Sequence, residues 1–186
     1  MKFKSLAFCL LAVVTGSCAL LAAMITNAAE AGLPPSFHIA QSVPEKTLNN
    51  IIRRSENGDA MIDYILKIPG YAARQDHAYA HLFTKNLLIA WANAQAQFVQ
   101  QDCGGKYLEG EICGIDENPV SCAQDFSDKE YLYQTQEESG QKAIISYRWA
   151  DQATSNAGPK YRLVKSGNDW KLDGVNCGNG LKFNMN

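Results

Sequence analysis

The chain has 186 residues, of which 46% are hydrophobic, 10% aromatic and 19% charged, and its 17 basic and 19 acidic side chains give a net charge of −2. This balance excludes collagen-like, coiled-coil and highly charged disordered proteins. The chain also lacks the excess of positive charge that nucleic-acid binding requires, so no nucleic-acid partner is expected.

Residues 1–28 have the pattern of a signal peptide. Two lysines precede an uncharged apolar stretch, residues 6–25, and small residues follow it. Cleavage after Ala28 or after Ala31 would suit a signal peptidase, so we expect a periplasmic or secreted protein. Cleavage after Ala28 would remove two lysines and no acidic residue, which changes the net charge from −2 to −4.

Two alternatives to cleavage of this leader stay open. An apolar stretch of the length of residues 6–25 can span a bilayer and act as a retained anchor. The small residues before Cys18 weakly resemble a bacterial lipidation site, although the apolar stretch continues past that cysteine. We expect association with a membrane only in these two cases.

Four of the six cysteines lie outside the leader, namely Cys103, Cys113, Cys122 and Cys177. An even number of cysteines in an exported chain predicts two disulfides. Their spacing lacks the short C-x2-C pairs typical of a zinc site. Four cysteines allow three pairings, and each of the three joins Cys177 to the segment 103–122. The bridge at Cys177 should therefore contribute more stability than the weakly patterned tail that follows it.

Helical signals fill the chain up to the first of these cysteines. Residues 29–43 contain two prolines and predict an irregular arm. A helix is expected to begin at Pro44 and to end at Asn57-Gly58, followed by a short helix that Asp59 caps and Pro69-Gly70 ends. Apolar residues at steps of three and four predict a long helix over residues 75–101.

Strand signals replace the helical period after a turn-rich segment, residues 103–128. Polar and apolar residues alternate in the segment from Lys142 to Trp149, and residues 160–165 and 170–175 flank a hairpin turn. Residues 130–135 predict a further short strand. Helices followed by a run of strands indicate an α+β fold, with N-terminal helices packed on a bent antiparallel sheet in a single domain of residues 44–186.

The second half of the chain resembles a known family. The sequences that carry the resemblance are FTKNLL at residues 83–88, AIISY at residues 143–147, YRLVK at residues 161–165 and DWKLDGV at residues 169–175. In this layout the chain is similar to exported bacterial proteins of the domain of unknown function 3828 family, over about residues 75–177. The resemblance implies a cone-like fold of the nuclear transport factor 2 type and a location in the cell envelope. It implies no activity.

Candidate catalytic and metal sites are weak. His77 and His81 lie four residues apart on the predicted long helix and could face one metal ion, but the glutamate of an H-E-x-x-H motif is missing. Aspartates at positions 102, 116, 125 and 173 are the carboxylates that a cone-shaped pocket could use as a general base. We assign no catalytic residue and no cofactor.

Aromatic residues of the predicted sheet are the candidate binding residues, namely Tyr147, Trp149, Tyr161 and Trp170. These residues could pack in the core, or they could line a pocket or a protein-binding face of the sheet, and both alternatives stay open. We expect a non-enzymatic binding module of inhibitor or immunity type whose partner is another envelope or secreted protein. The alternative is a small enzyme that uses a carboxylate or a histidine in a cone-shaped pocket.

Overall fold

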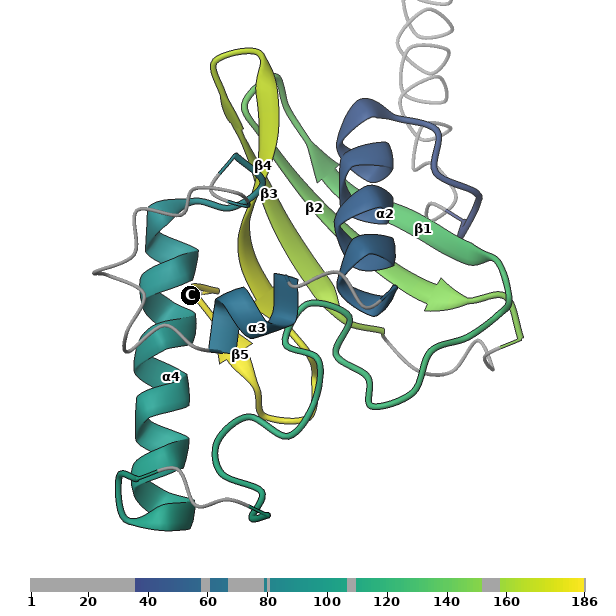
Figure 1. Ribbon diagram of the computed structural model, residues 1–186. Helices are drawn as coiled ribbons and strands as arrows, with labels where there is room; N and C mark the ends of the chain where they lie inside the picture. The colour runs from purple at the N-terminus through teal and green to yellow at the C-terminus, as the bar shows by residue number, and fades with distance from the viewer. Residues whose placement is uncertain are drawn as a thin grey trace, which may run out of the picture. The chain divides into compact units, whose positions relative to one another are not determined.

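The structure, a computed structural model, describes residues 36–57, 61–66, 79, 81–106, 110–151 and 158–185 (Figure 1). The predicted leader and the part of the predicted arm before Ser36 lie outside these residues. His77, the predicted cap Asp59 and the predicted stop Pro69-Gly70 also lie outside them. Among the described residues, no helix is both long enough and apolar enough to cross a membrane.

Five antiparallel strands form one sheet in which every strand pairs with its neighbour in the chain. The strands are β1 (Tyr131–Glu138), β2 (Lys142–Trp149), β3 (Lys160–Ser166), β4 (Asp169–Asn176) and β5 (Lys182–Phe183). β2 has the bounds that its alternating sequence predicts. The remaining predicted strands are confirmed with slightly longer bounds. Gly167, whose φ of 64° suits glycine, makes the tight turn between β3 and β4.

Three helices are described, α2 (Val43–Glu56), α3 (Met61–Leu66) and α4 (Lys85–Cys103). Ser42 caps α2 with a complete capping box, in which Ser42 Oγ accepts from the Glu45 amide and the Glu45 carboxylate accepts from the Ser42 amide. Helices on an antiparallel sheet confirm the predicted α+β class.

The long helix begins later than its sequence pattern predicts, at Lys85 instead of near residue 75. Thr84 caps α4, because its hydroxyl accepts a hydrogen bond from the Leu87 amide. The preceding residues pair with a strand: the Leu172 amide donates to the Leu82 carbonyl, and the Thr84 amide donates to the Leu172 carbonyl. These backbone bonds to β4 compete with helix formation before Lys85. The periodicity of the side chains did not reveal them, because it carries no information on backbone pairing with a distant strand.

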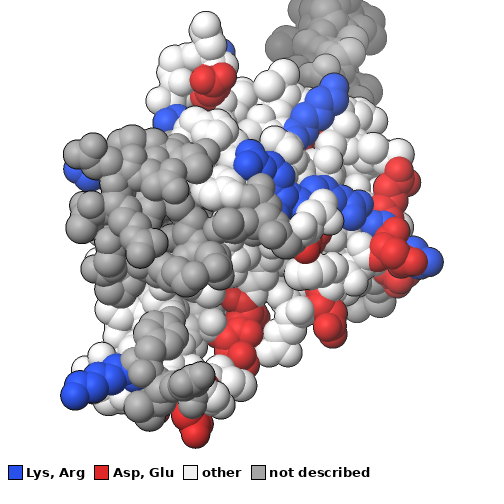
Figure 2. All heavy atoms as spheres, viewed as in Figure 1, with Lys and Arg blue, Asp and Glu red and all other residues white. Residues whose placement is uncertain are grey.

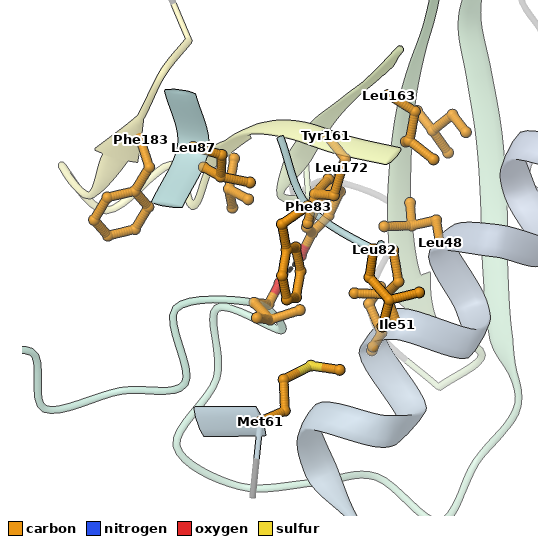
Figure 3. Packing of buried hydrophobic residues seen from close by; sticks show 14 of the residues in the cluster. Leu48, Ile51, Met61, Leu82, Phe83, Leu87, Tyr161, Leu163, Leu172 and Phe183 are labelled. Carbon is orange, nitrogen blue, oxygen red and sulfur yellow. Dashed lines mark hydrogen bonds between the residues drawn. The ribbon is translucent and has the colours of Figure 1, made fainter. Parts of the chain in front are cut away.

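All three helices cover the same face of the sheet. Leu48 and Ile51 of α2, Met61 of α3, and Phe83 just before α4 converge with Leu172 of β4 in one buried cluster (Figure 3). Trp91 of α4 is fully buried and meets the Phe83 ring edge-on, with ring centroids 5.1 Å apart. Burial of these large side chains supplies the main driving force for docking α4 on the sheet.

The C-terminal tail is part of this core, contrary to the prediction of a weakly tied tail. Lys182 and Phe183 form β5, and the Phe183 ring is buried against Trp91 with centroids 6.2 Å apart. The Asn184 side chain donates to the Asp173 carbonyl. The sequence pattern failed here because a two-residue strand is too short for any alternation to be visible.

Both predicted disulfides form, and they pair Cys103 with Cys113 and Cys122 with Cys177. The first closes a loop at the end of α4, across 10 residues. The second joins residues 55 apart and links the loop before β1 to the end of β4. The expectation that Cys177 is tied to the segment 103–122 is confirmed.

Candidate functional site

Four tyrosines form a row on the helix-covered face of the sheet. Tyr131 and Tyr133 of β1, Tyr147 of β2 and Tyr161 of β3 are all at most 3% exposed. Ring centroids of Tyr131 and Tyr147 lie 5.5 Å apart, and those of Tyr147 and Tyr161 lie 5.7 Å apart. The register of the strands produces this row, because Tyr133 pairs with Tyr147 and Ile145 pairs with Tyr161.

Each hydroxyl in the row donates a hydrogen bond. The hydroxyls of Tyr147 and Tyr161 donate to the backbone carbonyls of Ser121 and Val120, at 2.5 and 2.8 Å. The Tyr133 hydroxyl donates to Asn49 Oδ1 at 2.9 Å. Burial raises the pKa of every tyrosine in the row well above the usual value, so each stays protonated and acts as a donor at neutral pH.

Glu56, the last residue of α2, is the acidic group of this cluster. Tyr131 donates to Glu56 Oε2 at 2.6 Å, and the Arg53 guanidinium lies 3.8 Å from the centre of the Tyr131 ring. Glu56 is 7% exposed, and its Oε1 has no hydrogen-bond partner among the described residues. Burial raises the pKa of the Glu56 carboxyl, although the Tyr131 hydrogen bond and the Arg53 charge oppose that shift.

Sequence reasoning missed Glu56, although a signal was present. Leu48, Ile52 and Glu56 follow each other at steps of four and therefore share one face of α2. A carboxylate that continues an apolar stripe of a helix faces the core, where its pKa must respond to burial.

The predicted aromatic binding residues divide into two groups. Tyr147 and Tyr161 belong to the buried row, so core packing describes their environment in this structure. Trp149 and Trp170 are partly buried and pack against the same core from the ends of β2 and β4. The structure therefore brings Tyr147 and Tyr161 together with Glu56 and leaves the two tryptophans at the margins.

The predicted histidine and aspartate candidates do not converge on this cluster. His81 is exposed before α4, and no three metal-ligating side chains gather among the described residues. Asp173 forms an ion pair with Arg162, in which Nε and Oδ2 are 2.7 Å apart, and accepts from the Thr84 hydroxyl at 2.7 Å. Asp102 accepts from the Gly114 amide at 3.1 Å. These contacts give both aspartates structural roles.

Asp116 and Asp125 are both exposed on the loop that precedes β1. Asp116 accepts a hydrogen bond from the Gln124 side chain at 3.4 Å. Neither carboxylate contributes to the buried cluster around Glu56. They belong instead to a surface segment that the two disulfides hold.

Residues 110–130, here called the stapled segment, connect α4 with β1. Cys113 and Cys122 tie this segment to α4 and to the end of β4. Within it, Asn118 Oδ1 accepts from the amides of Val120 and Ser121, at 2.9 and 3.0 Å. The Asn118 side-chain amide donates to the Ser55 carbonyl at the end of α2. The segment is thus held to α2, α4 and the sheet.

Gly114 lets the stapled segment approach α4 closely. Its φ is 102°, and a Cβ at this position would lie 2.4 Å from Nε2 of the buried Gln95. Gln95 Oε1 accepts from the Ile115 amide at 2.8 Å. A larger residue at position 114 would therefore separate the segment from α4.

The stapled segment exposes two large apolar side chains. Ile112 is 70% exposed beside Cys113, and Phe126 is 55% exposed four residues after Cys122. The segment also contains six acidic residues and one lysine. Acidic side chains (red) are seen below the band of basic side chains (blue) that crosses the molecule in Figure 2.

No protein-family model, curated protein or solved structure matches this chain. The resemblance to the domain of unknown function 3828 family therefore stays a prediction. The two disulfides are compatible with an extracellular or periplasmic protein, because such bonds persist mainly in oxidising compartments.

Two arrangements in this structure could support a function. One is the buried row of tyrosines with the acid Glu56, whose hydrogen bonds join the sheet to α2 and to the stapled segment. The other is the stapled segment, which presents apolar side chains on a fixed backbone. The first is suited to proton transfer and the second to contact with another macromolecule.

Proposed function

We propose that the protein is an exported binding module without enzymatic activity, of inhibitor or immunity type, that acts in the periplasm or outside the cell. The signal-peptide pattern of residues 1–28 and the two disulfides support export. The resemblance to exported bacterial proteins points to the same location.

The observation that carries the proposal is the exposure of Ile112 and Phe126 on the stapled segment. Large apolar side chains at the surface lower the free energy when a partner covers them. Because disulfides and the Asn118 hydrogen bonds already order this segment, binding would sacrifice little conformational entropy. Inhibitors use a fixed loop in this way, and the acidic character of the segment favours a partner with a basic surface.

Affinity capture from a periplasmic extract tests the proposal. The bait is the exported protein, and the comparison is a variant that carries Ile112→Ser and Phe126→Ser. Ile89→Ser is the matched control, because Ile89 is 47% exposed on α4 and is not part of the stapled segment. We expect a partner that wild type and the control retain and the double variant loses. Capture of the same proteins by all three baits would contradict the proposal.

Glu56 favours a second candidate function, a small enzyme with a buried acid. A carboxyl group with a raised pKa and a free oxygen has the properties of a general acid or base. A panel of ester, amide and glycoside substrates tests this candidate with wild type and Glu56→Gln. Turnover that the substitution abolishes without unfolding the protein would support it. Turnover that is absent, or equal in both proteins, would speak against it.

A further inference from the structure

The sheet has a second face, opposite the helices. Tyr133, Ile145 and Leu163 point into the helix-covered core, so the residues between such core positions point the other way. These residues, here called the outer sheet face, are Leu132, Gln134, Glu137, Lys142, Ile144, Ser146, Arg148, Lys160, Arg162, Val164 and Lys171. They are mostly partly exposed side chains of β1 to β4.

The outer sheet face is positively charged, although the whole chain carries a net charge of −2. Five of its residues are Lys or Arg, spread over β2, β3 and β4. Two carboxylates pair with them: Lys142 Nζ lies 3.1 Å from Glu137 Oε2, and Arg162 pairs with Asp173. Within the described part of the chain, Arg148 and Lys160 form no ion pair. The face therefore has a net positive charge.

Aliphatic side chains lie between these cations. Ile144 pairs with Arg162 in the register of β2 and β3, and Leu132 pairs with Arg148 in the register of β1 and β2. Val164 lies between Lys142 and Lys171 in adjacent strands. A surface that mixes cations with aliphatic groups suits the boundary between anionic headgroups and acyl chains of a lipid layer.

The chain also enters the described domain beside this face. The Arg148 guanidinium lies 4.6 Å from the centre of the Phe37 ring. The next residue, His38, exchanges two backbone hydrogen bonds with Tyr133 at the edge of β1. In a protein that retains the leader as an anchor, ten residues, 26–35, separate this point from the apolar stretch of residues 6–25, and ten residues span at most about 36 Å.

We propose that the outer sheet face docks on an anionic lipid surface. The positive charge of the face, the aliphatic residues within it and the entry of the chain beside it all favour a membrane over a soluble anion. Each lysine near such a surface is expected to strengthen association about fivefold at low salt, and this contribution should decrease as salt screens the charges. The stapled segment stays available to a protein partner.

Lysine footprinting of the exported protein, with its native N-terminus, tests this proposal. The protein is incubated with phosphatidylcholine vesicles that contain or lack phosphatidylglycerol, and the acetylation rate of each lysine is measured by mass spectrometry. We expect anionic vesicles to slow acetylation of Lys142 and Lys160 several-fold. Lys85 and Lys106, at the two ends of α4, serve as internal controls whose rates should not change.

Two further comparisons separate charge-driven docking from adsorption through apolar contacts alone. In Lys160→Gln/Lys171→Gln, the association constant with anionic vesicles should fall about twentyfold or more, so that protection of Lys142 is lost, whereas Lys85→Gln/Lys106→Gln should leave both unchanged. Thermal melts would establish that both variants fold. Equal protection by both vesicle types, or no protection by either, would overturn the proposal. A parallel incubation with soluble polyglutamate tests a soluble anion instead, and protection by polyglutamate alone would also overturn it.

Discussion

The two disulfides should contribute unequally to stability. The bond between Cys122 and Cys177 closes a chain segment of 55 residues, whereas the bond between Cys103 and Cys113 closes one of 10 residues. In the chain-entropy treatment, removal of the long-range bond costs about 4 kcal/mol of unfolding free energy, and removal of the short-range bond costs about 2.7 kcal/mol. We therefore expect a difference of about 1.5 kcal/mol between the two double-alanine variants.

Urea unfolding of Cys122→Ala/Cys177→Ala and Cys103→Ala/Cys113→Ala, followed by tryptophan fluorescence, measures this difference. Each pair serves as the control for the other, because both variants lose one bond and gain no free thiol. Thermal melts give a second measurement of the same effect. The melting temperature of wild type should lie about 8–16 °C above that of the variant without the long-range bond, since 1 kcal/mol corresponds to about 2–4 °C in a domain of this size. A larger loss of unfolding free energy in Cys103→Ala/Cys113→Ala than in Cys122→Ala/Cys177→Ala would refute the entropic reasoning.

Three further predictions concern the tail and the buried acids. Phe183→Ala should destabilise the protein by about 3–5 kcal/mol in chemical denaturation, because its buried ring packs on Trp91. Burial would raise the pKa of Glu45, but the Thr135 hydroxyl and two backbone amides hold it below its usual value. Wild type should therefore exceed Glu45→Gln in stability at neutral pH and lose this advantage as pH falls through the lowered pKa, as acid titrations would detect. At Glu56 the pH dependence of stability has the opposite sign, because the pKa of its carboxyl is raised. Wild type should lose stability relative to Glu56→Gln as pH increases through that pKa, and thermal melts at several pH values would measure this loss.

The buried position of Phe183 changes what is expected of the tail. The sequence pattern alone predicts that loss of the Cys177 bridge costs more stability than loss of the residues after Cys177. With Phe183 in the core, the two changes should have similar costs, about 4 kcal/mol each. Comparison of a chain that ends at residue 177 with Cys122→Ala/Cys177→Ala would distinguish the two expectations.

Local chemistry in the sequence determined much of the fold. Alternation from Lys142 to Trp149 specified β2, and Pro44 and Asn57-Gly58 marked the two ends of α2 to within one residue. The even number of cysteines in the exported chain predicted two disulfides. It also predicted that Cys177 is bonded to the segment 103–122, because all three possible pairings of four cysteines have this bond. Each of these features depends on residues that are close in sequence or on combinatorial limits.

Tertiary structure decided the features that depend on contacts between distant segments. The start of α4 moved to Lys85 because the backbone before it pairs with Leu172 of β4. β5 exists because the Phe183 side chain fits against Trp91, a contact that no local pattern encodes. The pairing of Tyr131 with Glu56 joins residues 75 apart and places an acid in the core. The sequence shows which residues are apolar, acidic or aromatic, but burial and strand register determine which of them meet, and hence their pKa values and exposure.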